Sequence, residues 1–197
     1  MSALQPDAAD LLEPSALGVV VEAGRGSLPF ALIHGESLVA CAAWALGDAG
    51  VTVLDASVAW SSIREAEQPL VLHDPLCPMT PSEFLATCVR TAVAEDVVVV
   101  GVRPVTDTVK VVAHGRVGAT LDRSGLVGVC APIVLPAGVC AALAAPPLGR
   151  FAEVVAGLSG LHALRLLEAP PAARRVASAD DLRLVEALTA PTGTTPG

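Results

Sequence analysis

The sequence predicts an α/β domain with three layers, Rossmann-like, in which helices cover both faces of a mostly parallel β-sheet. Short apolar runs alternate with segments of helical periodicity, which is the pattern of such layered domains. Val97–Val102 is apolar without alternation, so this strand is expected in the centre of the sheet and covered on both faces. With 53% hydrophobic and 16% charged residues, a chain of 197 residues can bury the core of one domain.

The first strand is expected at Leu17–Val21, and it leads directly into the loop Glu22-Ala23-Gly24-Arg25-Gly26-Ser27. Two glycines in this loop allow a tight turn and a close approach of the backbone to a ligand. The pattern then predicts a helix at Glu36–Leu46 and strands at Val51–Leu54 and Pro69–His73.

A rigid loop, Asp74-Pro75-Leu76-Cys77-Pro78-Met79, follows the strand that ends at His73. Thr80 is expected to cap the next helix, with Pro81 at its first position and Glu83 completing a capping box. This is a strong signal for the start of a helix.

The second half of the chain is expected to contain a β-hairpin, because Lys110–Ala113 and Arg116–Leu121 flank His114-Gly115. Ser178 is expected to cap a last helix, Ala179–Leu188, with acidic residues in its first turn. Between them the pattern predicts strands at Ala131–Leu135 and Leu164–Glu168 and helices at Gly138–Leu143 and Phe151–Gly157. Residues 1–14 are expected to be an extension, 15–189 one domain, and 190–197 a flexible tail.

Composition and charge argue against several classes of partner. The net charge is −8, aromatic residues make up 3% with no Tyr, and arginines do not cluster with aromatics, so nucleic acid is not expected as a partner. The apolar runs are too short to span a membrane and the N-terminus lacks the pattern of a secretory signal, so a cytoplasmic location is expected. The five cysteines show no CxxC spacing and are expected to be mostly buried small hydrophobes.

Several blocks of the chain resemble those of one enzyme family in order and spacing. They are Ala23-Gly24-Arg25-Gly26, Leu72-His73-Asp74-Pro75-Leu76-Cys77-Pro78, Pro104–Lys110, Thr120–Leu126 and Val176–Glu186. They are similar to the glycine-rich nucleotide loop, the H-D-A-A-R-P loop, the P-V-x-D-T-x-K and T-V-D-R-x-x-L segments and the C-terminal segment of the 2-C-methyl-D-erythritol 4-phosphate cytidylyltransferase (IspD) family. Members of this family join CTP to the phosphorylated polyol and release pyrophosphate.

The resemblance implies a nucleotidyltransferase fold with a protruding hairpin arm, at about 108–123, that forms a homodimer. It implies nucleotide contacts from Ala23, Gly24, Gly26 and Ser62. It implies contacts to the phosphorylated polyol from Asp74, Thr108, Arg123 and Arg175, where Thr108 and Arg123 reach into the neighbouring subunit. Mg²⁺ is the expected cofactor of an active enzyme, with Asp74 as its ligand.

The resemblance to the family fails at the residues that bind the triphosphate. Phe30 stands in place of the family lysine, no basic residue stands at Gly26-Ser27-Leu28, and Arg25 lies at a variable position of the motif. Cys77 replaces the arginine of the H-D-A-A-R-P loop. Phosphoryl transfer depends on cations placed against developing charge, so activity is expected to be weakened or lost.

Three functions remain open: a working cytidylyltransferase, an inactive dimeric paralogue that acts as a binding or regulatory module, and a transferase for another sugar or polyol phosphate. Simpler structural roles also remain open for the candidate residues. Asp74-Pro75 is a common loop start, Asp107-Thr108 can brace a turn, and Arg174-Arg175 can be a surface pair. Lys110, the sole lysine of the chain, is expected to mark the base of the arm rather than the catalytic centre, and His73 to be a packed loop anchor rather than a base.

Overall fold

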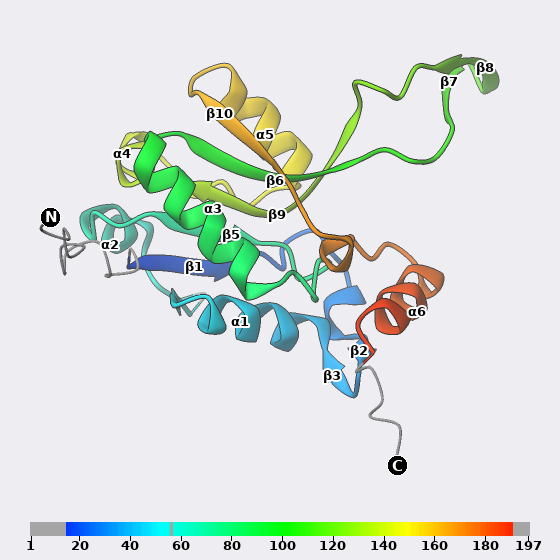
Figure 1. Ribbon diagram of the computed structural model, residues 1–197. Coiled ribbons are helices and arrows are strands. Elements are labelled where there is room, and N and C mark those ends of the chain that lie inside the picture. The colour runs from blue at the N-terminus through cyan, green and yellow to red at the C-terminus, as the bar shows by residue number, and fades with distance from the viewer. Residues whose placement is uncertain (1–14, 56, 191–197) are drawn as a thin grey trace, which may run out of the picture.

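The computed structural model describes residues 15–55 and 57–190, so the expected N-terminal extension and nearly all of the expected tail lie outside the described residues. Its main feature is a six-stranded sheet with the order β10-β6-β9-β5-β1-β4 (Figure 1). The strands of this sheet are β1 (Ala16–Val20), β4 (Val51–Val53), β5 (Leu70–His73), β6 (Val98–Pro104), β9 (Val127–Leu135) and β10 (Leu164–Glu168).

The sheet is mostly parallel, as the sequence predicts. Strand β1 runs parallel to β4 and β5, and β10 runs parallel to β6. Strand β9 is the exception, because it pairs antiparallel with both β5 and β6 and joins the two parallel groups. Strand β6 lies between β10 and β9 and is buried from Val98 to Val102, which agrees with its unbroken apolar sequence.

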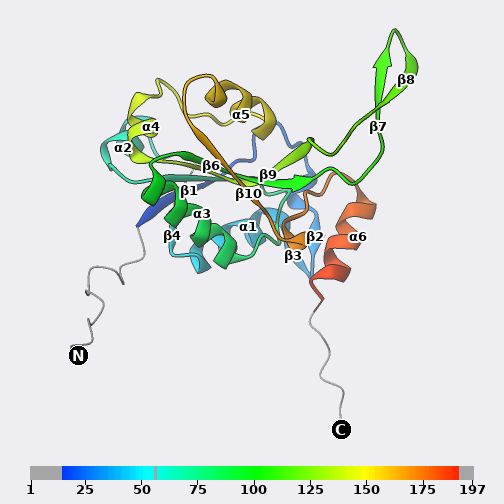
Figure 2. The ribbon, with the colours of Figure 1, turned by 45° about the horizontal axis from the view of Figure 1, so that its top comes forward.

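Helices cover both faces of the sheet (Figure 2). One apolar cluster joins the sheet to α2 (Trp60–Glu65), α4 (Ala137–Ala142) and α5 (Phe151–Ser159). A second cluster on the opposite face joins it to α1 (Leu38–Asp48) and α3 (Ser82–Glu95). In the described part of the chain, no helix combines the length and the apolar character that crossing a membrane requires.

Three local features differ from the predictions. Thr80 does not cap α3: the cap residue is Pro81 and the Thr80 hydroxyl donates to the Cys77 carbonyl at 2.8 Å, so this side chain closes the preceding loop instead. The region before α1 contains a small antiparallel pair, β2 (Leu32–Ile33) and β3 (Glu36–Ser37), turned by His34 and Gly35 at positive φ. Helix α2 lies between the strands predicted at Val51–Leu54 and Pro69–His73, where no element was predicted.

The predicted hairpin is confirmed and forms an arm. Strands β7 (Val109–Ala113) and β8 (Arg116–Leu121) pair antiparallel across a turn at His114 and Gly115, both at positive φ. Figures 1 and 2 both show this arm standing away from the sheet and its helices. Lys110 donates to the Thr120 hydroxyl across the hairpin, so the sole lysine braces the arm.

A third apolar cluster fixes the last helix, α6 (Ala179–Leu188), beside the loop that follows β5. It contains Ile33, Leu38, Leu76, Val176 and Val185. The Ser178 side chain accepts from the Asp181 N–H at 3.1 Å, which confirms the predicted cap. The chain that enters α6 also passes through a short 3₁₀ turn, Pro171–Ala173.

Gly101 provides a test of the contact between β6 and β9. A Cβ at this position would lie 2.5 Å from the Ala131 carbonyl oxygen, and both backbones are held in the sheet. We expect Gly101→Ala to lower the free energy of unfolding by about 2 kcal/mol, measured by urea denaturation. Gly128→Ala is the control, because its Cβ would meet its nearest neighbour, the Arg103 carbonyl, at 3.8 Å. Equal stability of the two variants would contradict the prediction.

Candidate functional site

The loops that follow β1 and β5 meet at one edge of the sheet. These two strands are parallel neighbours, with Val20 opposite His73, and the Val21 N–H donates to the His73 carbonyl at 2.8 Å. Ligands of open α/β sheets bind outside the carboxyl ends of the strands. The glycine-containing loop and the Asp74 loop therefore lie where such a fold places its functional groups.

Asp74 is buried in this edge, with 3% of its side chain exposed. Its Oδ1 accepts from Arg25 Nε at 3.2 Å and from the Leu76 N–H at 3.0 Å. Its Oδ2 accepts from Arg25 Nη2 at 3.4 Å and from Arg175 Nε at 3.3 Å. Asp74 therefore binds two guanidinium groups and also fixes the turn of its own loop.

Arg25 is equally buried, with 2% of its side chain exposed. Besides its two bonds to Asp74, it donates through Nη1 to the carbonyls of Ala23 and Gly149. Its guanidinium carbon also lies 5.3 Å from the centre of the Phe151 ring, which is within the range of a cation–π contact. Arg25 thus joins the first loop, the Asp74 loop and the start of α5.

Arg175 reaches the site because the segment before α6 docks on the Asp74 loop. The Val176 N–H donates to the Leu76 carbonyl at 2.6 Å, and Val176 is buried in the third apolar cluster. The Arg175 side chain is 43% exposed and uses Nε for Asp74, which leaves its two outer nitrogens without a hydrogen bond to that carboxylate.

These groups line a cavity of about 460 Å³, which we term the arginine pocket. Its lining consists of Gly24, Arg25, Asp74, Val129, Arg150, Phe151, Ala152 and Arg175. Three guanidinium groups and one carboxylate give this lining a net charge of +2, although the chain carries −8. Arg150 is exposed and stands immediately before α5. The pocket is suited to an anion.

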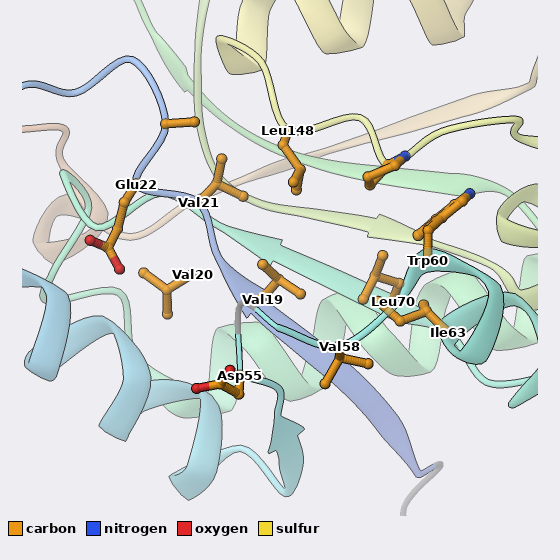
Figure 3. A pocket seen from close by; sticks show the side chains of 12 residues that line it. Val19, Val20, Val21, Glu22, Asp55, Val58, Trp60, Ile63, Leu70 and Leu148 are labelled. Atoms are coloured by element: carbon orange, nitrogen blue, oxygen red, sulfur yellow. The ribbon is translucent and has the colours of Figure 1, made fainter.

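A second cavity, of about 330 Å³, lies beside the same first loop (Figure 3). Apolar side chains make up most of its wall, including Val19, Val58, Trp60, Ile63 and Leu148, and Ala23 also lines it. The carboxylates of Glu22 and Asp55 are part of the lining as well (Figure 3). The Trp60 indole N–H already donates to the Leu143 carbonyl at 3.1 Å, so it is not free for a ligand.

A divalent metal on Asp74 does not fit this arrangement. A carboxylate offers about four lone-pair sites, and four hydrogen bonds occupy them here. Within residues 15–55 and 57–190, no group of three or more His, Cys, Asp or Glu side chains is placed to hold a metal ion. In this conformation the Asp74 carboxylate thus has no free lone pair for the Mg²⁺ ion that was expected there.

The structure brings together some of the residues singled out from the sequence and separates others. Asp74, Arg175 and Gly24 line the arginine pocket, and Ala23 lines the second cavity. Gly26, at positive φ as the loop requires, lines neither cavity, nor does Ser62 of α2. Thr108 and Arg123 lie exposed at the base of the arm and do not line the arginine pocket of their own chain.

Phe30 is 61% exposed at the end of a 3₁₀ turn, Leu28–Phe30, and lies outside the lining of both cavities. The position at which the family carries a lysine therefore presents an apolar ring to solvent. Nothing in this turn supplies a positive charge in its place.

Sequence reasoning did not single out Arg25 or Arg150, both of which line the arginine pocket. Arg25 stands at a variable position of the motif, so the motif did not indicate it as a site residue. The signal that could have found it is the small number of basic residues, 12 in this chain. Arg150 precedes a predicted helix start, which was the one available signal. The contact between Arg25 and Asp74 could not be predicted from sequence spacing, since 49 residues separate the two.

His73 and the cysteines have structural roles. His73 is fully buried, and this burial lowers the pKa of its ring to about 4. Its Nδ1 lies 3.0 Å from the Asp74 carbonyl and its Nε2 has no partner among the described residues, so it is a neutral loop anchor. Four cysteines are buried, and burial raises the pKa of Cys88 and Cys130 to about 12, as expected for small core hydrophobes.

Comparison with known proteins gives one sequence relative and several structural ones. No family model matches the chain. The bifunctional enzyme IspD/IspF of Clavibacter michiganensis subsp. michiganensis (strain NCPPB 382) is 35% identical over 123 residues, which cover 61% of this chain and 30% of that protein. The chain thus aligns with under a third of the length of this curated relative.

The solved structures extend the likeness to most of the fold. The 2-C-methyl-D-erythritol 4-phosphate cytidylyltransferase of Thermus thermophilus has a TM-score of 0.65 at 20% identity, over 87% of this chain and 96% of that chain. The corresponding enzyme (IspD) of Francisella tularensis has a TM-score of 0.61 at 13% identity, over 87% and 97%. The chain is thus similar in sequence to part of an IspD/IspF enzyme, and it shares the fold of these cytidylyltransferase structures.

Proposed function

We propose that the chain is a cytidylyltransferase-type protein that binds a phosphorylated polyol in the arginine pocket and transfers the cytidylyl group from CTP weakly or not at all. The observation that carries this proposal is a contrast between two sites. The arginine pocket around Asp74 is lined by three arginines and is positively charged. The turn at Leu28–Phe30, in contrast, presents an exposed aromatic ring where the triphosphate needs a cation.

Support for an anionic ligand comes from the side chains themselves. Arginine recognises phosphate through pairs of parallel N–H donors, and its charge persists at every physiological pH. Arg150 and the outer nitrogens of Arg175 supply such donors in a cavity of about 460 Å³. This volume lies in the range that small ligands occupy in proteins.

Weak transfer follows from electrostatics. Attack on the α-phosphorus places negative charge on the triphosphate, and preorganised cations stabilise that charge. Removing one such donor typically costs roughly 10²–10³ in rate. In this chain Phe30 adds no charge, and Arg25 is committed to Asp74 and two carbonyls.

The second cavity is the candidate place for the nucleoside of CTP. Its apolar walls would cover the faces of a flat ring (Figure 3). Glu22 and Asp55 add negative charge to this cavity, which opposes a triphosphate and agrees with weak binding of CTP.

The proposal is tested by incubating the protein with CTP, Mg²⁺ and 2-C-methyl-D-erythritol 4-phosphate and measuring pyrophosphate release. The Thermus thermophilus enzyme serves as the positive control. We expect release at least about a hundredfold slower than the control. Pyrophosphate release at the rate of the control would contradict the proposal that activity is weakened.

The second candidate function is an inactive binding or regulatory module. It is favoured by the loss of every basic residue from Gly26 to Phe30. Calorimetry separates the two candidates, because the module binds the phosphorylated polyol and leaves CTP unbound. Tight binding of CTP in the presence of Mg²⁺ would count against the module.

A homodimer formed through the arm is the proposed assembly. The arm exposes apolar side chains on its strands, with Val112 at 66% and Val117 at 71% exposure, and an isolated two-stranded hairpin is marginally stable in water. A partner subunit would cover these side chains. It would also bring Thr108 and Arg123 toward the arginine pocket of the neighbour.

Light scattering tests this assembly through Val117→Asp. We expect a dimer mass for the unchanged protein at micromolar concentration and a monomer mass for the variant, since the new carboxylate would be buried without a partner. Leu161→Asp is the control, because Leu161 is 76% exposed on the body of the domain. A monomer mass for the unchanged protein would contradict the proposal.

A further inference from the structure

The neutralisation of Asp74 has a consequence for how the arginine pocket binds its ligand. Asp74 is 3% exposed, and a buried carboxylate requires a positive partner. In nucleotidyl transfer a divalent metal can supply that charge. Here two arginines of the chain supply it.

The contacts of Arg25 indicate that it is a permanent, not a transient, partner of Asp74. Its Nε and Nη2 both face the carboxylate, at 3.2 and 3.4 Å, and its Nη1 is held by the carbonyls of Ala23 and Gly149. The Phe151 ring lies against the guanidinium. Arg25 therefore cannot leave Asp74 without abandoning contacts to three segments of the chain.

Arg150 and Arg175 differ from Arg25 because they keep free donors. Arg175 donates to Asp74 through Nε alone, and 43% of its side chain is exposed. The Arg150 guanidinium has no hydrogen-bond partner within residues 15–55 and 57–190. Both side chains line the cavity that also contains Asp74.

We propose that the Arg25 guanidinium occupies the place of a divalent cation at Asp74, so that the arginine pocket binds a phosphate monoester through Arg150 and Arg175 without a metal. This inference rests on the proposed function, since it concerns the same pocket and the same class of ligand. It adds the mode of binding and two residues to which no role is assigned by the resemblance or by the comparisons, Arg25 and Arg150.

The first experiment is calorimetry of 2-C-methyl-D-erythritol 4-phosphate binding to the unchanged protein, once with excess Mg²⁺ and once with excess EDTA. Equal affinity in both is the expected result. Binding that requires Mg²⁺ would overturn the inference and leave the proposed function standing. Absence of binding in both would overturn the inference and the proposed function together.

The second experiment identifies the ligand-binding arginines. Arg150→Ala and Arg175→Ala are each expected to weaken binding by about tenfold or more, the effect of losing one charge-assisted contact. Arg183→Ala is the matched control and is expected to bind normally, because Arg183 is a solvent-exposed arginine of α6 paired with Asp180. Unchanged affinity in Arg150→Ala would overturn its assignment.

The third experiment addresses Arg25 directly. Arg25→Gln removes the built-in cation, and we expect binding of the phosphorylated polyol by this variant to become at least about tenfold stronger when Mg²⁺ is added. Mg²⁺-independent binding by the folded variant would overturn the role of Arg25. Circular dichroism checks folding, and for an unfolded variant the comparison of Mg²⁺ with EDTA on the unchanged protein decides.

Discussion

Asp74→Ala is expected to lower the free energy of unfolding by about 3–5 kcal/mol, the usual cost of removing one partner from a buried ion pair. The loss arises because Arg25, with 2% of its side chain exposed, would remain charged and buried without a carboxylate. The variant would also lose the bond from the Leu76 N–H that shapes the loop. Urea denaturation followed by circular dichroism measures the change.

Two further variants isolate the cause of that loss. Asp74→Asn keeps the size of the side chain and removes its charge, so an intermediate loss is expected. Asp180→Ala removes the carboxylate of an exposed pair with Arg183 and is expected to change stability little. A loss in Asp74→Ala no larger than in Asp180→Ala would show that the buried centre contributes nothing to folding.

Acidification is expected to destabilise the protein through His73. Burial lowers the pKa of this side chain from 6.5 to about 4, so between these two values the unfolded chain binds a proton that the folded chain does not. Stability from this group is fully present above pH 6.5 and is lost as the pH falls toward 4. The shift corresponds to about 3 kcal/mol.

The measurement compares urea unfolding at several pH values for the unchanged protein and for His73→Leu. The variant has no proton to bind at this position, so the decline of stability between pH 6.5 and 4 is expected to be shallower by about 3 kcal/mol. The slope is the readout, because the substitution also removes the contact of Nδ1 with the Asp74 carbonyl. Parallel slopes for the two proteins would contradict the prediction.

Local sequence patterns predicted most of the elements, because hydrophobic periodicity and turn residues act over short distances. Strand β10 and helix α6 begin and end at the predicted residues. The cap at Thr80 failed for a local reason as well: its hydroxyl has a competing acceptor, the Cys77 carbonyl. The pair β2–β3 was missed because two residues in each strand leave too short a pattern.

The candidate site was predicted in part. The resemblance implied that Asp74 and Arg175 contact the same ligand, which stays a prediction, and the structure places the two side chains 3.3 Å apart. Thr108 and Arg123 remain predictions, since their proposed partners belong to a second subunit. Arg25 occupies a variable position of the motif, yet it is the most buried cation in the arginine pocket.

The sequence by itself determined the family resemblance, the order of strands and helices, the arm, and the loss of a basic residue at Phe30. These features depend on residue type and spacing along the chain. The tertiary structure decided what Asp74 does, because its partners come from 49 and 101 residues away and meet it where parallel strands end side by side. Charge compensation in a buried site depends on distance in space, so only the fold shows that Arg25 and Arg175 are the cations that pair with Asp74.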